Sequence, residues 1–204
     1  MGRPVSYDED AVVNAALGQF WAAGFSACSI DALVGATGLN RHSLYQSFGG
    51  KSGLFTRVLE RYLDDYSRAL LTIFDRYTGV TALKRYFRAA LSGFDGRGCL
   101  VANTAVELGD AEPAVHQLIA AYYGQVARCL VRAITQAQAA GDLRAELAPR
   151  ATAWWLVRAL HGLAVGARLG GQPALSADAL LALLGASPGR RGKQGVEKGA
   201  ARRR

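Results

Sequence analysis

Apolar side chains recur every three or four residues along most of this 204-residue chain, and glycines interrupt the pattern at intervals. An α-helix brings residues i, i+3, i+4 and i+7 onto one face, so this spacing is typical of amphipathic helices. No β-branched stretch alternates between apolar and polar residues over a useful length, and the chain holds only five prolines. The pattern therefore predicts an all-α fold with about nine helices.

Four helices are predicted in the first third of the chain, because capping residues and glycines mark their ends. The fourth carries periodic apolar residues from Leu54 to Tyr66. For the first three, the expected N-caps and glycine stops are Ser6 with Glu9 in a capping box, Gly24, Ser29, Gly38, Asn40 and the pair at 49–50.

The later predicted helices are longer and more apolar. They cover about residues 80–92, 99–108, 112–140, 149–169 and 177–184. Pro149 suits a first helical turn, and Ser176 suits an N-cap. We therefore expect a compact three-helix unit at 6–50, a larger helical bundle at 51–185 and a tail at 186–204.

The net charge of +8 is concentrated in that tail. Residues 186–204 carry seven lysines and arginines against one acid, Glu197, so the rest of the chain has a net charge of only +2. A run of Gly, Arg and Lys predicts disorder and sequence-independent contact with polyanions. A merely solubilising tail is the alternative, and neither interpretation assigns a function to the folded part.

The stretch TGLNRHSLYQSFGGKSGLF, residues 37–55, joins two short helices through a tight glycine turn, and the second helix is polar on its outside. This is the pattern of a helix-turn-helix, whose second helix enters the major groove of DNA. Arg41 can donate two hydrogen bonds to guanine, while Ser43 and Gln46 can contact other base edges. The pattern therefore indicates a DNA-reading helix that starts after Asn40.

Phosphate contacts are expected beside this helix. The phenol of Tyr45 can reach a phosphate oxygen, although Tyr45 can also face the core with Leu44 and Phe48. Lys51 begins the fourth helix, where an ammonium and backbone amides together can hold a phosphate, and Ser29 can do likewise at the start of the second helix. A plain three-helix packing unit with a polar outer face is the alternative, and local charge does not decide between the two.

Residues 16–55, ALGQFWAAGFSACSIDALVGATGLNRHSLYQSFGGKSGLF, resemble the TetR family of bacterial transcriptional regulators. The aromatic pair before AAGF, the SIDALVGATGL helix and turn, the SLYQSF helix and the GKSGLF run stand in the family's order and spacing. The large helical lobe that follows is also what the family has, although its sequence is a weaker marker.

The resemblance implies roles for individual residues. Tyr45 and Lys51 would hold phosphates, and Ser29 matches a backbone-contact position. Cys28 stands where the family commonly has threonine, and its thiol is a poorer cap or phosphate contact than a hydroxyl. Arg3 is either an arm toward the minor groove or part of a frayed terminus. The implied base-reading positions are Arg41, His42, Ser43 and Gln46.

A homodimer through the last two helices is expected, because one short helix contacts too few base pairs for useful specificity. The penultimate helix is apolar on more than one side, and Gly162 and Gly166 would let a second helix come close. Leucines from Leu180 to Leu184 make the last helix similar, and the resemblance also implies a four-helix interface here. Burial of both helices within one chain is the alternative.

The remaining helices of the bundle can enclose an effector pocket. Large aromatic rings such as Tyr122 are plentiful there, although most such rings only fill a core. Cys99, Asn103 and Glu107 recur at i, i+4 and i+8, which is roughly one helix face. Cys99 would lie at a helix N-terminus after Arg97, and both features favour the reactive thiolate.

Two interpretations of this cysteine remain open. A subset of TetR-like regulators has a similar Gly-Cys start to this helix, and some of those respond to electrophiles or oxidants. The alternative is a small buried residue, with Asn103 and Glu107 satisfying backbone groups or forming ion pairs. The candidate ligand-binding or sensing residues are Cys99, Asn103 and Tyr122.

The leading hypothesis is a repressor that binds a near-palindromic double-stranded operator and is released by a small molecule or by a reactive electrophile or oxidant. The alternative is a helical interaction scaffold without specific DNA binding. The three histidines are scattered and no HxxxH or CxxC spacing occurs, so we expect no enzyme, no metal site and no cofactor. The polar start MGRPVSYDED, the lack of an eighteen-residue apolar run and three widely spaced cysteines predict a cytoplasmic protein without a membrane helix.

Overall fold

A computed structural model describes residues 7–94, 96–169 and 176–185, and within them it contains helices and no strands. The predicted all-α fold is confirmed, and the described residues form nine helices when 51–76 is counted as one long helix. The elements are α1 Glu9–Ala23, α2 Ile30–Thr37, α3 Arg41–Phe48, α4 Lys51–Tyr62, a π-helical turn Leu63–Ser67, α5 Arg68–Leu71, α6 Ile73–Arg76, α7 Gly79–Ser92, α8 Leu100–Leu108, α9 Pro113–Ala139, α10 Pro149–Ala167 and α11 Ala177–Leu183.

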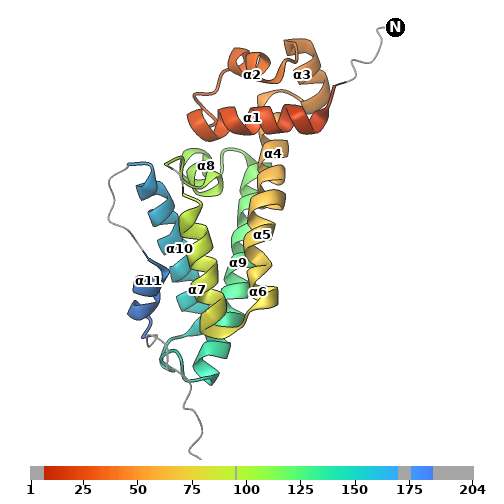
Figure 1. Cartoon of the computed structure of the whole chain (residues 1–204). Coiled ribbons are helices and arrows are strands. Elements are labelled where there is room, and N and C mark those ends of the chain that lie inside the picture. The colour runs from red at the N-terminus through yellow and green to blue at the C-terminus, as the bar shows by residue number, and fades with distance from the viewer. Residues whose placement is uncertain (1–6, 95, 170–175, 186–204) are drawn as a thin grey trace, which may run out of the picture.

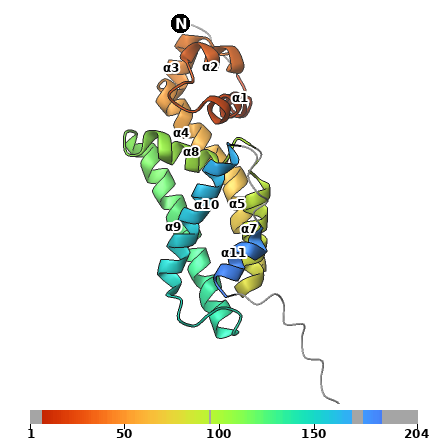
Figure 2. The same cartoon turned by 90° about the vertical axis from the view of Figure 1, so that its left-hand side faces the viewer.

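The molecule is elongated, with a three-helix unit (α1–α3) at one end and a helical body (α4–α11) below it (Figure 1). α4 runs out of the three-helix unit into the body, and α8 lies directly beneath α1. In the body α9 packs against α7 and α10, while α11 packs on the outer side of α7 (Figure 2). No helix in the described ranges is both long and apolar enough to cross a bilayer.

The helix ends follow local side-chain chemistry. Ser29 and Asn40 are N-caps as predicted: Ser29 Oγ accepts a hydrogen bond from Ala32 N at 3.0 Å, and Asn40 Oδ1 accepts one from Ser43 N at 2.8 Å. The predicted N-cap of α1 is wrong. The Asp8 carboxylate takes that place and accepts from the amides of residues 10 and 11, whereas Ser6 lies outside the described residues.

Aromatic rings join the three-helix unit to the body. Phe20 of α1 is fully buried, and its ring centroid lies 4.8 Å from that of Phe55 on α4 in an edge-to-face arrangement. Trp21 meets Tyr62 of α4 in the same geometry at 5.1 Å. α2 and α3 each contribute one fully buried leucine, Leu33 and Leu44. α4 therefore packs both within the three-helix unit and within the body.

The long helix from residue 51 to 76 contains a π-helical turn at Leu63–Ser67 that the periodicity did not predict. Such a turn inserts an extra residue into the helix and often occurs at functional sites. Here it places Asp65, Tyr66 and Ser67 on the wall of a cavity in the helical body.

Candidate DNA interface and effector cavity

The segment from α2 to α3 has the geometry of a helix-turn-helix. α2 ends at Gly38, whose φ of +70° is left-handed and therefore suits glycine, and α3 begins three residues later at Arg41. One face of α3 is anchored in the core by Leu44, which is fully buried. The opposite face carries the exposed side chains of Arg41, His42 and Gln46. The predicted DNA-reading helix is therefore at the surface, at the end of the molecule.

Two of the residues expected on this surface, Ser43 and Tyr45, differ in how far their side chains are exposed. Ser43 is only 8 % exposed and lies on the buried side of α3, so its side chain is less available for base contact than those of its neighbours. Tyr45 is 53 % exposed, so the prediction that it can face the core is wrong, whereas its phenol remains available to a phosphate. Its ring lies against Gly50, where an added Cβ would come within 2.9 Å of the Tyr45 ring. Glycine at position 50 therefore leaves room for the tyrosine.

Arg41 is held by a neighbouring acid. Its Nη2 lies 2.6 Å from Asp31 Oδ1, in the first turn of α2, and both side chains are largely exposed. The hydrogen bond to Asp31 and its charge raise the pKa of Arg41, which stays a cation. Asp31 thus orients the Arg41 guanidinium, and the sequence did not indicate this pairing.

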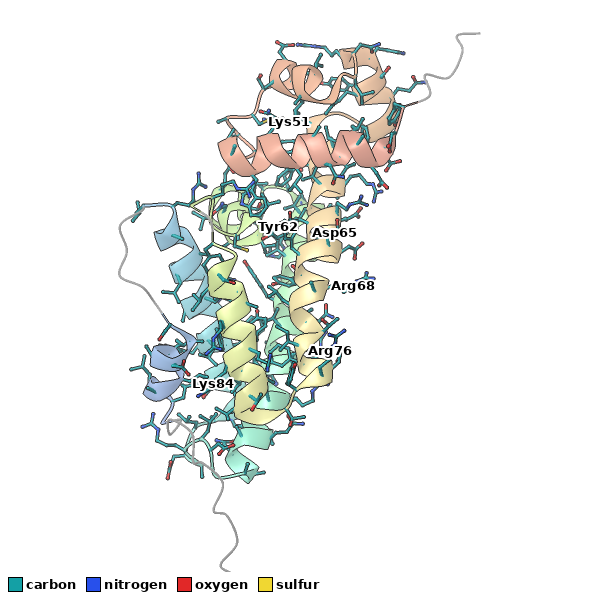
Figure 3. All side chains as sticks on the ribbon, viewed as in Figure 1. Lys51, Tyr62, Asp65, Arg68, Arg76 and Lys84 are labelled. Carbon is teal, nitrogen blue, oxygen red and sulfur yellow. The ribbon has the colours of Figure 1, made fainter. Side chains whose placement is uncertain are left out.

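Lys51 stands at the start of α4, as predicted, and its ammonium stays near the turn between α1 and α2. Nζ lies 4.6 Å from the centre of the Phe25 ring and donates to the carbonyl of Ser26 at 3.3 Å (Figure 3). Ser29 is exposed at the N-terminus of α2. Cys28 beside it is buried, and burial raises the pKa of its thiol, so Cys28 is a core residue. Arg3 lies outside the described residues.

Glu107 links the body to the three-helix unit. Its carboxylate oxygens accept hydrogen bonds from Phe25 N at 2.8 Å and Ser26 N at 2.6 Å, across more than eighty positions of sequence. Burial alone would raise the pKa of Glu107, but the two backbone N–H groups and the Lys51 charge hold it below its usual value. The i+8 spacing from Cys99 singled out this glutamate, but nothing in the sequence indicated its partners.

The same junction has further contacts. Trp21 Nε1 donates to the carbonyl of Gly98 at 3.2 Å, and the Arg97 guanidinium lies 4.1 Å from the centre of the Trp21 ring. Ser52 Oγ, in the first turn of α4, donates to Glu112 at 3.0 Å. Residues 97–112 therefore hold the α1–α2 end of the three-helix unit from below.

A cavity of about 420 Å³ lies below this junction. Its wall is made mainly of aromatic and aliphatic side chains from α1, the π-helical turn, α5, α7, α9 and α10. Two of the predicted ligand-binding residues, Cys99 and Tyr122, are on the wall. The third, Asn103, is not: its Nδ2 donates to the carbonyl of Arg97 at 2.9 Å and so stabilises the loop before α8. Asn103 and Glu107 thus satisfy backbone groups, as the alternative interpretation proposed.

Asp65 and Arg97 are charged residues on the cavity wall, whereas the Tyr62, Tyr122 and His161 side chains there are neutral. The Tyr62 hydroxyl donates to Cys99 Sγ at 3.6 Å. Burial raises the pKa of Tyr122 to about 12. Burial, with the nearby Arg158 charge, lowers the pKa of His161 to about 4, so this imidazole is uncharged at neutral pH. Among the described residues, no cluster of three His, Cys, Asp or Glu side chains could hold a metal ion.

Two family models match the chain. Residues 12–58 match "Bacterial regulatory proteins, tetR family", and residues 79–183 match "Tetracyclin repressor-like, C-terminal domain". The second match alone spans half of the chain. The chain belongs to the TetR family. It is therefore a DNA-binding transcriptional regulator rather than an enzyme, and the alternative of a scaffold without DNA binding is wrong.

Individual members of the TetR family support this assignment. The HTH-type transcriptional repressor ComR of Escherichia coli is 30 % identical over 175 residues, which cover 83 % of either chain. The HTH-type transcriptional repressor DhaR of a Mycobacterium species is 26 % identical over 141 residues, covering 68 % of this chain and 71 % of DhaR. A cysteine mutant of the TetR family regulator CifR, solved with 26-bp double-strand operator DNA, is 29 % identical with a TM-score of 0.72. That match covers 90 % of this chain and 96 % of CifR.

Proposed function

We propose that this TetR-family protein is a repressor that binds a near-palindromic operator as a homodimer and leaves it when a small molecule fills the cavity. The observation that carries the proposal is the junction at residues 97–112, which contacts both the cavity and the three-helix unit that presents α3. Arg41, His42 and Gln46 would meet base edges, while Tyr45, Lys51 and Ser29 would meet phosphates. ComR and DhaR are transcriptional repressors, which supports repression rather than activation by this protein.

The surface of α10 and α11 supports a dimer. Trp155 is 54 % exposed and Leu183 is 66 % exposed, although both are large apolar side chains. Ala159, Gly162 and Gly166 follow Trp155 along one side of α10, and Cβ atoms added at Gly162 or Gly166 would meet nothing within 4 Å in the described structure. We call this surface the α10–α11 face; its residues are Trp155, Ala159, Gly162, Val165, Gly166, Leu169 and Leu183. Within the described residues these side chains stay exposed, which supports a second copy of the chain as the partner.

Ligand entry would change the operator-bound shape through the same junction. A molecule in the cavity touches Trp21, Tyr62 and Arg97, which also hold the three-helix unit. The ligand can shift the equilibrium only by binding one arrangement of the two units better than the other. A wider or rotated dimer, whose two α3 helices miss successive major grooves, would then be favoured.

Binding-site selection from random DNA, followed by a mobility shift with the full chain, tests the proposal. We expect an enriched near-palindrome that binds at least about 10³-fold more tightly than a shuffled duplex at physiological salt, because specific binding by such proteins exceeds non-specific binding by that margin. Equal affinity for the two duplexes would reject sequence-specific repression.

Release by a reactive electrophile or oxidant is a second candidate, and one observation favours it: Cys99 is on the cavity wall, so a ligand there can reach its sulfur. In mass spectrometry after mild N-ethylmaleimide treatment, we expect Cys99 to be alkylated faster than Cys129, whose thiol pKa is raised by burial. Operator release by the reagent should then be absent from Cys99→Ser. Equal labelling of the two thiols would count against a sensing role.

A further inference from the structure

We infer that Asp31 determines base specificity through Arg41: its carboxylate fixes the direction of the arginine, so that Arg41 reads one base pair instead of moving among neighbouring bases and phosphates. The inference rests on the proposed function, because it assigns a role within the same DNA-reading surface. Three features carry it: the position of the acid, the geometry of its contact with Arg41, and the donors that this contact leaves for a base.

Asp31 is the only acidic residue between positions 24 and 51, the segment that contains α2, α3 and the turns beside them. α2 and α3 lie side by side at the end of the molecule (Figure 1). Asp31 is in the first turn of α2, two residues after Ser29, which is a proposed phosphate contact. A carboxylate in this place repels DNA phosphates whatever the base sequence. Any contribution of Asp31 to operator recognition is therefore to selectivity and not to overall affinity.

The contact between Asp31 and Arg41 joins the first turn of α2 to the first residue of α3. Asp31 Oδ1 accepts a hydrogen bond from Arg41 Nη2 at 2.6 Å. The two side chains are 82 % and 62 % exposed, so water competes with the pair and its contribution to folding stability is small. DNA bound over the pair would displace much of that water, and an ion pair is stronger in less polar surroundings. The contact therefore matters most when Arg41 meets DNA.

The contact leaves Arg41 most of its donors. An arginine side chain has five N–H donors in a rigid plane, and Asp31 is bonded through Nη2 alone. Within the described residues, Nε and Nη1 make no hydrogen bond or ion pair. A guanine needs two donors on one edge of the plane, so Arg41 can contact it while Asp31 keeps its hydrogen bond. An arginine that is already oriented loses less conformational freedom when it binds the base.

Asp31→Ala separates selectivity from affinity. Mobility shifts with the full chain measure the affinity for three duplexes: the selected operator, the operator changed at the base pair whose preference is lost in Arg41→Ala, and a shuffled duplex. We expect the ratio of the first two affinities to fall about three- to tenfold, which is part of what a bidentate base contact supplies. Affinity for the shuffled duplex should rise about two- to threefold, because each subunit loses one charge that repels phosphates.

The sign of the change in this ratio decides the role of Asp31. An unchanged ratio would show that Arg41 needs no orientation, and a larger ratio would show that Asp31 holds Arg41 away from the operator. A loss of preference at a different base pair would show that Asp31 reads a base directly. Each of these results would overturn the inference. In the double variant of Asp31→Ala with Arg41→Ala, the ratio should equal that of Arg41→Ala alone, since the effect acts through Arg41.

Asp31→Asn and Asp64→Ala are the matched controls. Asp31→Asn keeps an acceptor oxygen without the charge, so it should retain more of the ratio than Asp31→Ala. Asp64→Ala removes an exposed acid of the π-helical turn that pairs with Arg68 at 2.7 Å, and it should leave the ratio unchanged. An equal fall in Asp64→Ala would contradict a specific role for Asp31. The melting temperature of Asp31→Ala should stay within about 2 °C of that of the unmodified protein, because an exposed ion pair adds little stability.

The same measurements separate the inference from the proposed function. If Arg41→Ala loses a base preference and Asp31→Ala does not, sequence-specific operator binding stands and the role of Asp31 is rejected. If the unmodified chain selects no sequence from random DNA, both are rejected, because Arg41 then reads no operator base.

Discussion

Gly162→Arg should leave the protein folded but monomeric, and its affinity for the operator should fall by about 10³-fold or more. A Cβ added at position 162 would meet no described atom within 4 Å beyond the backbone of its own helix, so the monomer has room for a side chain there. Arginine is also a better helix former than glycine. The same side chain would occupy the space needed by the partner's helix on the α10–α11 face. One α3 helix alone contacts half of the operator, so binding falls toward the non-specific level.

Sedimentation and a mobility shift with the selected operator measure the two effects of Gly162→Arg. The control is Gly162→Ala, which keeps a small side chain and should remain dimeric with nearly unchanged affinity. Leu183→Arg changes the α11 side of the same face and should likewise give a monomer with weaker operator binding. A dimeric Gly162→Arg that binds the operator normally would show that another surface pairs the two copies.

Arg41→Ala should weaken operator binding by about 1–3 kcal/mol for each half-site and relax the preference at one base pair in each. The guanidinium is exposed on α3 and oriented by Asp31, so it is ready to form two hydrogen bonds to a guanine. Its removal should leave the fold intact, because the Arg41 side chain is largely exposed and pairs only with the exposed Asp31. Site selection repeated with the variant measures the change in preference, and titration measures the change in affinity.

Lys51→Ala is the matched control for base reading. If Lys51 holds a phosphate, its removal should weaken binding to all sequences about equally and lower the salt dependence by about one ion per half-site. The selected sequence should be the same as that of the unmodified protein. An unchanged base preference in Arg41→Ala would place Arg41 among the phosphate contacts. A changed base preference in Lys51→Ala would place Lys51 among the base contacts.

Much of the fold could be predicted, because its signals act within one helical turn. The caps at Ser29 and Asn40 and the stop at Gly38 depend on hydrogen bonds over three or four residues. The error at α1 was of the same local kind, since aspartate and serine are both good N-caps and α1 begins at Glu9, directly after Asp8. Helix bounds in the body also agree closely with the predicted ranges, because apolar periodicity and proline placement determine them.

The candidate DNA interface could be predicted in part. Spacing and residue type were enough to locate α3 and to expect Arg41, His42 and Gln46 on its outside. Periodicity could not separate the buried Ser43 from the exposed Tyr45, because they flank the same buried residue, Leu44, and their own burial depends on where α4 and Gly50 lie.

Sequence alone thus determined the helices, their order and the family's DNA-reading segment, because these follow from contacts between near neighbours in the chain. Only the tertiary structure decided that Glu107 would hold residues 25 and 26, and that Asn103 would bind the Arg97 carbonyl instead of lining the cavity. Each of these depends on the angle and distance at which two helices pack. Apolar spacing indicates which face of a helix is buried, but it does not indicate which residues of other helices that face contacts.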